Sequence, residues 1–141
     1  MPVAVVHWYN RADFRAHPER LFVFGDNFAR QGHGGQAREA RGEPNAVGIR
    51  TKKAPTYRED DFLTDAEYAL NVTAILEDFQ PILLALREGR TVVWPADGIG
   101  TGIAQLQGRA PETLRFINTV IDSLMRVYGT TALQPTERNR P

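Results

Sequence analysis

Two glycine-rich stretches of the chain carry residue types suited to holding an anion. The stretch TVVWPADGIGTGIAQL (91–106) changes from apolar residues to a segment with glycine at every second position, 98, 100 and 102. The stretch LFVFGDNFARQGHGGQA (21–37) changes in the same way and has glycines at positions 32, 34 and 35. Closely spaced glycines let several backbone N–H groups turn toward one point, and such a concavity binds phosphate oxygens. We therefore predict that two loops grip one ligand from two sides, which suits a ligand with two phosphates.

Neither loop identifies its ligand by itself. No Lys-Ser or Lys-Thr pair follows the second loop, so it is not a P-loop, and its spacing is not G-x-G-x-x-G. A tight strand-to-helix connection explains three glycines about as well as a ligand does. Two such loops together favour a binding site, because loops at the carboxyl ends of strands in an open α/β sheet share one crevice.

The apolar pattern places both loops on an α/β fold. Strands are expected at 3–8, 21–25, 46–50 and 91–94, a short helix at 35–41, and longer helices from Thr64 and from Pro111 to Tyr128. Thr64 and Glu67 form a capping-box pattern, and Pro81 must kink the first long helix or start a new one. The strand at 91–94 is apolar at successive positions, so it should be central and buried. We predict a three-layer α/β/α sandwich with a mixed sheet, formed by one domain at 1–129, and a loose tail at 130–141.

Composition limits the function classes. The 141 residues include 17 basic and 17 acidic side chains, and the resulting net charge of zero argues against a general electrostatic grip on nucleic acid. The sequence has no cysteine and only three widely spaced histidines, so we expect neither a metal site nor a cofactor. The amino-terminal residues do not resemble a signal peptide, and no apolar run is long enough for a membrane span. We therefore expect a cytoplasmic monomer.

The order of these motifs resembles a macrodomain, the α/β/α module that binds ADP-ribose. FGDNFARQGHGGQA is similar to the first macrodomain loop and WPADGIGTGIAQL to the phosphate-gripping second loop. Between them, AVGIRTKKAPTYRED is similar to the strand and loop of the terminal ADP-ribose glycohydrolase type, which includes antitoxins that remove ADP-ribose from DNA. In that subclass a Thr-Lys pair ends the strand and its lysine is catalytic. The resemblance, which covers about residues 21–128, implies that Lys52 is the catalytic residue.

Two features depart from this family. The subclass often has an aspartate just after the last glycine of the second loop, whereas Ala104 stands at that place and the nearest acid is Asp97. The family commonly ends in a strand, but the tail of this chain is polar and contains proline. The first departure bears on catalysis and the second on the edge of the sheet.

The candidate catalytic residues are Lys52 as nucleophile and Asp97 as general acid/base. An amine nucleophile needs a lowered pKa, supplied by desolvation or by a nearby cation such as Lys53, although adjacent side chains on a strand point to opposite faces. The alternative interpretations are two solvated lysines at a strand end and a turn aspartate. The candidate ligand-binding residues are Asp26, Asn27, His33, Gly34, Gly35, Gln36, Thr51, Gly98, Ile99, Gly100, Thr101 and Gly102. Tyr57 is a candidate to cover the ligand, whereas Phe24 and Trp94 are expected in the core.

The sequence thus predicts a protein that binds ADP-ribose and hydrolyses ADP-ribosyl links on DNA or protein. A binding module that reads ADP-ribose without turnover is the alternative, which Ala104 favours and Lys52 disfavours. A nucleic-acid-binding domain is a third possibility, disfavoured by the neutral charge. We expect Gly100→Val to abolish binding, because it would fill the space that the phosphates need.

Overall fold

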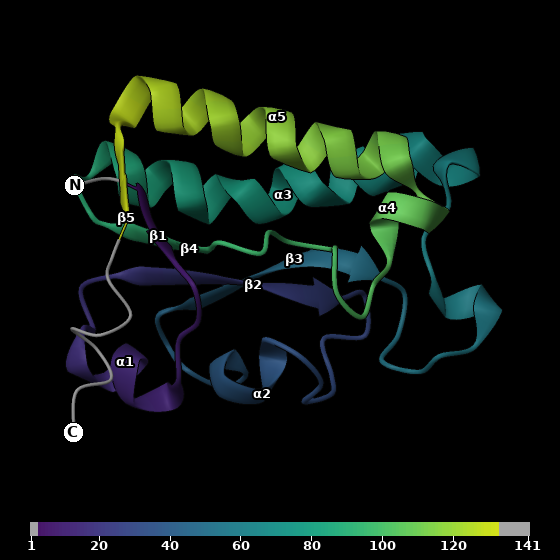
Figure 1. Ribbon diagram of the computed structural model, residues 1–141, viewed down its shortest axis with the longest axis horizontal. Helices are drawn as coiled ribbons and strands as arrows, with labels where there is room; N and C mark the ends of the chain where they lie inside the picture. The colour runs from purple at the N-terminus through teal and green to yellow at the C-terminus, as the bar shows by residue number, and fades with distance from the viewer. Residues whose placement is uncertain (1–2, 133–141) are drawn as a thin grey trace.

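A single parallel sheet forms the centre of the molecule (Figure 1). The structure is a computed structural model and describes residues 3–132. The strands lie in the order β3-β2-β4-β1-β5, and all four pairings are parallel. Their bounds are β1 Val3–Val6, β2 Leu21–Asn27, β3 Ala46–Lys52, β4 Val92–Pro95 and β5 Thr130–Ala132. The chain therefore has an α/β fold, as predicted.

Helices cover both faces of this sheet (Figure 1). The long helices α3 and α5 lie on one face, and the short helices α1 and α2 lie on the other. The bounds are α1 Arg11–Ala16, α2 Ala37–Ala40, α3 Tyr68–Arg87, α4 Leu106–Arg109 and α5 Pro111–Tyr128, with 3₁₀ turns η1 Glu59–Asp61 and η2 Asp65–Glu67. The predicted helix from Pro111 to Tyr128 is confirmed. The segment Asp65–Arg87 is long and apolar enough to cross a membrane by length and composition alone, but the core helix of a folded domain passes the same test.

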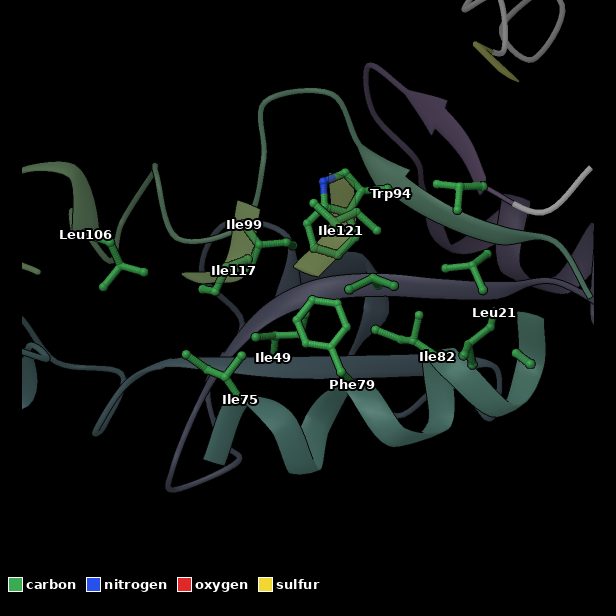
Figure 2. Packing of buried hydrophobic residues seen from close by; sticks show 14 of the residues in the cluster. Leu21, Ile49, Ile75, Phe79, Ile82, Trp94, Ile99, Leu106, Ile117 and Ile121 are labelled. Atoms are coloured by element: carbon green, nitrogen blue, oxygen red, sulfur yellow. The ribbon is translucent and has the colours of Figure 1, made fainter. Parts of the chain in front are cut away.

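The core divides into two clusters, one on each side of the sheet. The larger packs Ile75 and Phe79 of α3 against Trp94 of β4, and the rings of Phe79 and Trp94 are stacked with centroids 6.1 Å apart (Figure 2). The smaller cluster contains Phe24 and lies toward α1 and α2. Alternate residues of β4 belong to opposite clusters, because successive strand side chains point to opposite faces. All four residues of β4 are buried and the strand is the middle one of five, which confirms the prediction for this segment.

The mixed sheet predicted from the sequence is not found. Each connection between successive strands contains at least one helix. A helical crossover returns the chain to the same end of the sheet, so the next strand runs parallel to the last. The antiparallel pairing that the described residues do contain is an isolated bridge between Lys52 and Phe62, outside the five-stranded sheet.

The start of α3 and the start of the tail also differ from the predictions. Thr64 and Glu67 form no capping box, because η2 precedes α3 and the Glu67 carboxylate instead pairs with Lys53 at 2.8 Å. The helix then continues through Pro81 without interruption. The start of the expected loose tail forms β5, which pairs with β1, while residues 133–141 of that tail lie outside the described residues.

Candidate functional site

A cavity of about 560 Å³ lies where the carboxyl ends of β2, β3 and β4 meet. The loop after β2 forms one wall, the loop after β4 forms the other, and the end of β3 lies between them. The predicted site residues that line this cavity are Asp26, Asn27, Gly34, Gly35, Gln36, Thr51, Lys52, Asp97, Gly98, Gly100, Thr101 and Gly102. The two glycine loops and the Thr-Lys pair, which are far apart in the sequence, therefore surround one space.

The loop after β4 presents a row of free backbone donors. Within the described residues, the N–H groups of residues 99–104 donate to no protein acceptor. Gly98 and Gly100 have φ values of +87° and +90° and alternate with residues that lack a positive φ, as in an anion-binding nest. The carbonyl oxygens of Gly100 and Gly102 accept N–H groups of Leu106 and Gln105, at 2.9 and 3.1 Å, so they turn back toward α4. The loop therefore offers donors, which is what a phosphate requires.

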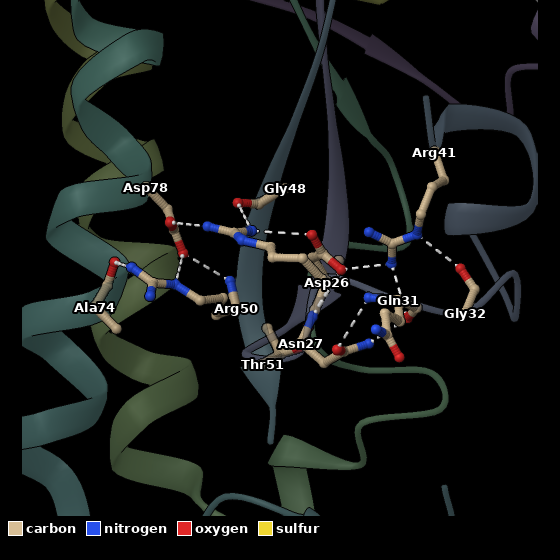
Figure 3. Close-up of polar contacts among 12 residues, drawn as sticks. Asp26, Asn27, Gln31, Gly32, Arg41, Gly48, Arg50, Thr51, Ala74 and Asp78 are labelled. Carbon is tan, nitrogen blue, oxygen red and sulfur yellow. Dashed lines mark hydrogen bonds and ion pairs between the residues drawn. The ribbon is translucent and has the colours of Figure 1, made fainter. Parts of the chain in front are cut away.

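The loop after β2 is held in place by ion pairs to two buried carboxylates (Figure 3). The carboxylate of Asp26, whose side chain is 3% exposed, binds Arg30 at 2.9 Å and Arg41 at 2.6 Å. Arg30 also binds Asp78 of α3 at 2.7 Å, and Asp78 binds Arg50 of β3 at 3.0 Å. This chain of charges connects the loop to α2, β3 and α3. Charge-assisted hydrogen bonds of this kind are roughly twice as strong as neutral ones, so the loop is fixed before a ligand arrives.

The carboxylate of Asp26 is already paired within the protein. Asp26 lines the cavity, but its carboxylate is occupied by two arginines and by the backbone N–H of Asn27 at 2.8 Å. A Cβ at Gly48 would lie 2.6 Å from an Asp26 carboxylate oxygen, so this position of β3 must stay a glycine. Asp26 acts as an anchor for the loop, and Asn27, whose amide donates to the Gln31 carbonyl at 2.8 Å, completes the turn.

Two side chains join the loops across the cavity. The Gln36 amide accepts the N–H of Gly25 at 2.8 Å and donates to the carbonyl of Gly98 at 3.1 Å. The Gln36 side chain forms no cap for the following helix α2. From the other side, the Ile103 side chain packs over Gly34 and Gly35, where an added Cβ would lie 3.1 Å from Ile103 Cδ1. The relative position of the two loops is therefore set by specific contacts.

Lys52 lies in the cavity wall with its amine enclosed. The residue is 5% exposed. Its Nζ lies 4.4 Å from the ring centroid of Phe62 and 5.0 Å from that of Tyr57, and it donates a short hydrogen bond to the Thr56 carbonyl. Removal of the amine from water disfavours its charged form, whereas the two ring faces and the carbonyl acceptor favour it. The alternative of a solvated lysine at a strand end applies to Lys53, which is 42% exposed at its side chain and pairs with Glu67.

Burial lowers the pKa of Lys52 below its usual value, and this is the largest effect on it. Asp61 raises the pKa through its negative charge, and the positive charge of Arg109 lowers it. The neighbouring cation that an amine nucleophile needs is thus Arg109 and not Lys53. At neutral pH more of the Lys52 amine is neutral than in a solvated lysine, and the neutral amine is the nucleophilic form.

Four positions that the sequence singled out, three candidate site residues and Ala104, contribute to the cavity in different ways. Asp97 lines it, is exposed, and has no side-chain partner among the described residues. His33 is exposed but does not line it. The Ile99 side chain is fully buried in the larger core cluster, so this residue can contribute only its backbone N–H. Ala104 lines the cavity with 5% exposure, at the position where the resembling subclass often has an aspartate.

Some residues of the site were not predicted. Arg41 and Ile103 line the cavity, and Arg109 stands behind Lys52 against the ring of Phe62 at 3.6 Å. All three reach the site through tertiary packing, from α4 and from the segments around α2 and the second loop. No local pattern marks the two arginines, because a single arginine on or beside a short helix is normally a solvated surface residue. Tyr57, considered as a cover for the ligand, lines the cavity with a 69% exposed side chain.

Comparisons with known proteins give one match. The model of a family described as "Family of unknown function (DUF7831)" matches residues 4–120. A search of curated proteins and a search of solved structures found no match.

Proposed function

The chain belongs to this family of unknown function, and we propose that it binds ADP-ribose in the cavity and hydrolyses ADP-ribosyl links on a macromolecule, DNA or protein. The observation that carries the proposal is the pairing of two features in one cavity. One is the row of free N–H groups at residues 99–104, and the other is the enclosed amine of Lys52. The first suits a diphosphate and the second suits attack on a sugar carbon.

We further propose that the domain is a sandwich of the macrodomain type. Support comes from helices on both faces of the sheet and from glycine loops after β2 and β4. The Thr51-Lys52 pair at the end of β3, beside both loops, is a third point of likeness. The all-parallel sheet differs from the expected mixed one, so the likeness rests on the site more than on the strand directions.

In the proposed reaction the diphosphate is bound by the nest, and Asn27 lies beside the distal ribose. The neutral Nζ of Lys52 attacks the anomeric carbon, a C–N bond forms, and the bond from that carbon to the leaving group breaks. Asp97 acts as general acid and gives a proton to the leaving group. The resulting Asp97 carboxylate takes a proton from the Lys52 nitrogen and passes it to the ring oxygen, so the bond from the anomeric carbon to the ring oxygen breaks as the C=N bond of an imine forms. Water adds to this imine, and ADP-ribose leaves with the lysine restored.

A binding module without turnover is the second candidate function, and one observation favours it. Asp26 is held by two arginines and Ala104 replaces a carboxylate, so Asp97 is left as the acid that lines the cavity. Asp97 is exposed and its carboxylate has no side-chain partner among the described residues, so no neighbour holds it in one position beside a leaving group. A domain with this site that binds ADP-ribose and does not cleave it would act as a reader of the modification.

Binding is tested by calorimetry with ADP-ribose, AMP and NAD. We expect ADP-ribose to bind more tightly than AMP, because AMP carries one phosphate and lacks the distal ribose. No heat with any of the three at millimolar concentration would contradict both candidate functions. Turnover is tested separately on ADP-ribosylated DNA and on ADP-ribosylated protein, with released ADP-ribose as the readout.

Borohydride distinguishes the enzyme from the reader. The sequence contains only two lysines, Lys52 and Lys53, so an adduct is easily assigned. If the imine forms, reduction during turnover should leave ADP-ribose attached to Lys52 through a stable secondary amine, seen by mass spectrometry. Tight binding of ADP-ribose with neither turnover nor adduct would favour the reader.

A further inference from the structure

Arg109 of α4 contacts three side chains near Lys52, those of Glu59, Gln105 and Phe62. Its Nη1 and Nη2 donate to the two carboxylate oxygens of Glu59, at 2.8 and 3.1 Å. Its Nε donates to the side-chain oxygen of Gln105 at 3.0 Å, directly after the row of free N–H groups. Its guanidinium carbon lies 3.6 Å from the ring centroid of Phe62. One side chain thus connects the end of the second loop with the segment from Glu59 to Phe62.

That segment is what encloses the lysine. The ring of Phe62 is 2% exposed and its centroid lies 4.4 Å from Lys52 Nζ. Phe62 and Lys52 also form an isolated antiparallel bridge, and the N–H of Lys53 donates to the Asp61 carbonyl at 2.8 Å. If the segment moved away, water would reach the amine from this side. The position of Phe62 therefore decides how far the Lys52 amine is desolvated.

The geometry points to Arg109 as a positioning residue for Lys52, which holds the segment from Glu59 to Phe62 over the lysine and places a second cation against the same aromatic ring. Both effects favour the neutral amine, because one keeps water away and the other adds a like charge. This inference deepens the proposed function, since it names the residue that prepares its nucleophile. Its experiment needs neither ADP-ribose nor turnover, so the two can fail separately.

An exposed Arg–Glu pair would by itself be a weak argument. The side chain of Glu59 is 82% exposed, and surface ion pairs contribute little. The ring of Phe62 couples Arg109 to Lys52 more strongly, because it is buried and contacts both cations. Two like charges at one ring are unfavourable when both are protonated, and Lys52 is the group that can lose its proton, because an arginine keeps its charge.

The charged and titratable groups around Lys52 come from three segments. Asp61 raises the pKa of Lys52 and Arg109 lowers it. The ring of Tyr57 faces the amine at 5.0 Å, and Asp97 lines the same cavity from the second loop. Among these groups Arg109 supplies the positive charge that acts on the amine, so removing it should change the titration of Lys52 in a known direction.

The test measures how the reactivity of Lys52 depends on pH. The background is Lys53→Arg, which keeps the charge that pairs with Glu67 and leaves Lys52 as the only lysine. Trace acetylation with isotope-labelled acetic anhydride from pH 6 to pH 11 gives the midpoint at which the amine becomes reactive. The variants are Arg109→Gln and Arg109→Met, the second of which keeps an unbranched apolar stem against Phe62. Arg115→Gln is the matched control, because Arg115 is an arginine on α5 with a 72% exposed side chain.

We expect both Arg109 variants to move the Lys52 midpoint upward and to lower its acetylation rate at pH 8 several-fold, whereas Arg115→Gln should leave the midpoint unchanged. Circular dichroism and thermal unfolding show whether each variant is folded. A folded Arg109 variant whose Lys52 midpoint equals that of the Arg115→Gln control would overturn the inference. So would an equal upward shift in all three variants, since it would show that net charge alone is responsible.

Discussion

Gly102 offers the sharpest test of the phosphate-binding loop. It lines the cavity, it has no positive φ, and a Cβ added to it would meet no atom within 4 Å. Gly102→Val should therefore fold normally while it places a branched side chain at the row of free N–H groups. Gly100→Val, the substitution that the sequence suggests, is unsuitable. Its Cβ would collide with Leu106 and approach Thr51 Cγ2 at 3.3 Å, at a φ of +90°, so it would disturb the core and not the cavity.

The size of the effect follows from the donors that are lost. A hydrogen bond to a charged group contributes about 1.5–3 kcal/mol. If the valine prevents two of the N–H groups from reaching the diphosphate, the loss is about 3–6 kcal/mol, which weakens the dissociation constant for ADP-ribose by ~10²–10⁴-fold. The free energy of unfolding should change by less than about 1 kcal/mol, as for other surface substitutions without a packing defect.

Calorimetry with ADP-ribose measures the first quantity and urea unfolding the second. Gly108→Val is the matched control, because Gly108 is an exposed glycine of α4 with no atom near its Cβ position and does not line the cavity. The control should bind ADP-ribose as the wild type does. If Gly102→Val also binds like the wild type and is folded, the diphosphate is not held by this loop and the placement of the ligand is wrong.

Three further predictions concern the charged residues. Lys52→Ala should lose turnover and keep ADP-ribose binding, whereas the control Lys53→Ala should keep both. Asp97→Ala should slow turnover by ~10²–10⁴-fold. Turnover at the wild-type rate by Lys52→Ala would refute the lysine mechanism. Burial lowers the pKa of Lys52, so the unfolded chain binds the proton of this amine more tightly than the folded chain does. The resulting loss of folding stability is fully present below the folded-state pKa of Lys52. It disappears as pH rises toward the usual pKa of lysine. The difference in unfolding free energy between the wild type and Lys52→Met, from urea unfolding across neutral to alkaline pH, should therefore move in favour of the wild type as pH rises; a flat difference would contradict the shift. Asp26→Asn should lower the free energy of unfolding by about 1.5–3 kcal/mol, because Arg41 loses its charged partner while Arg30 keeps its pair with Asp78. A loss below about 0.5 kcal/mol in urea would show that the pairs do not anchor the loop.

Periodic segments of the sequence were enough to predict the elements that carry the cavity. The apolar run at residues 91–94 gave a central strand, displaced by one residue, because a strand buried on both faces has no polar positions. The helix from Pro111 to Tyr128 was found from its apolar spacing and its initial proline. The loops followed from these elements, since a loop that ends a parallel strand must lie at the carboxyl edge of the sheet.

The directions of strands and the partners of charged residues were not predictable in this way. Nothing local in Thr130–Ala132 marks a strand, because all three residues are exposed and their pairing with β1 depends on where α5 ends. Asp26 was a candidate ligand-binding residue because it follows a strand and precedes the glycines of the first loop. Its two arginine partners come from positions 30 and 41, and the sequence does not show that both turn inward.

The arginine network explains how a glycine-rich site can still be specific. Glycine loops have high conformational freedom, and ordering them on binding would reduce affinity. Here the loop after β2 is fixed by Asp26 and Arg30, and the loop after β4 is tied to it by Gln36. Arg30 itself has a φ of +54°, a conformation unusual for a non-glycine residue, which its pairs with Asp26 and Asp78 hold in place. The loops are therefore ordered during folding, so the residues that carry the free N–H groups and Lys52 are already in place around the cavity before any ligand binds.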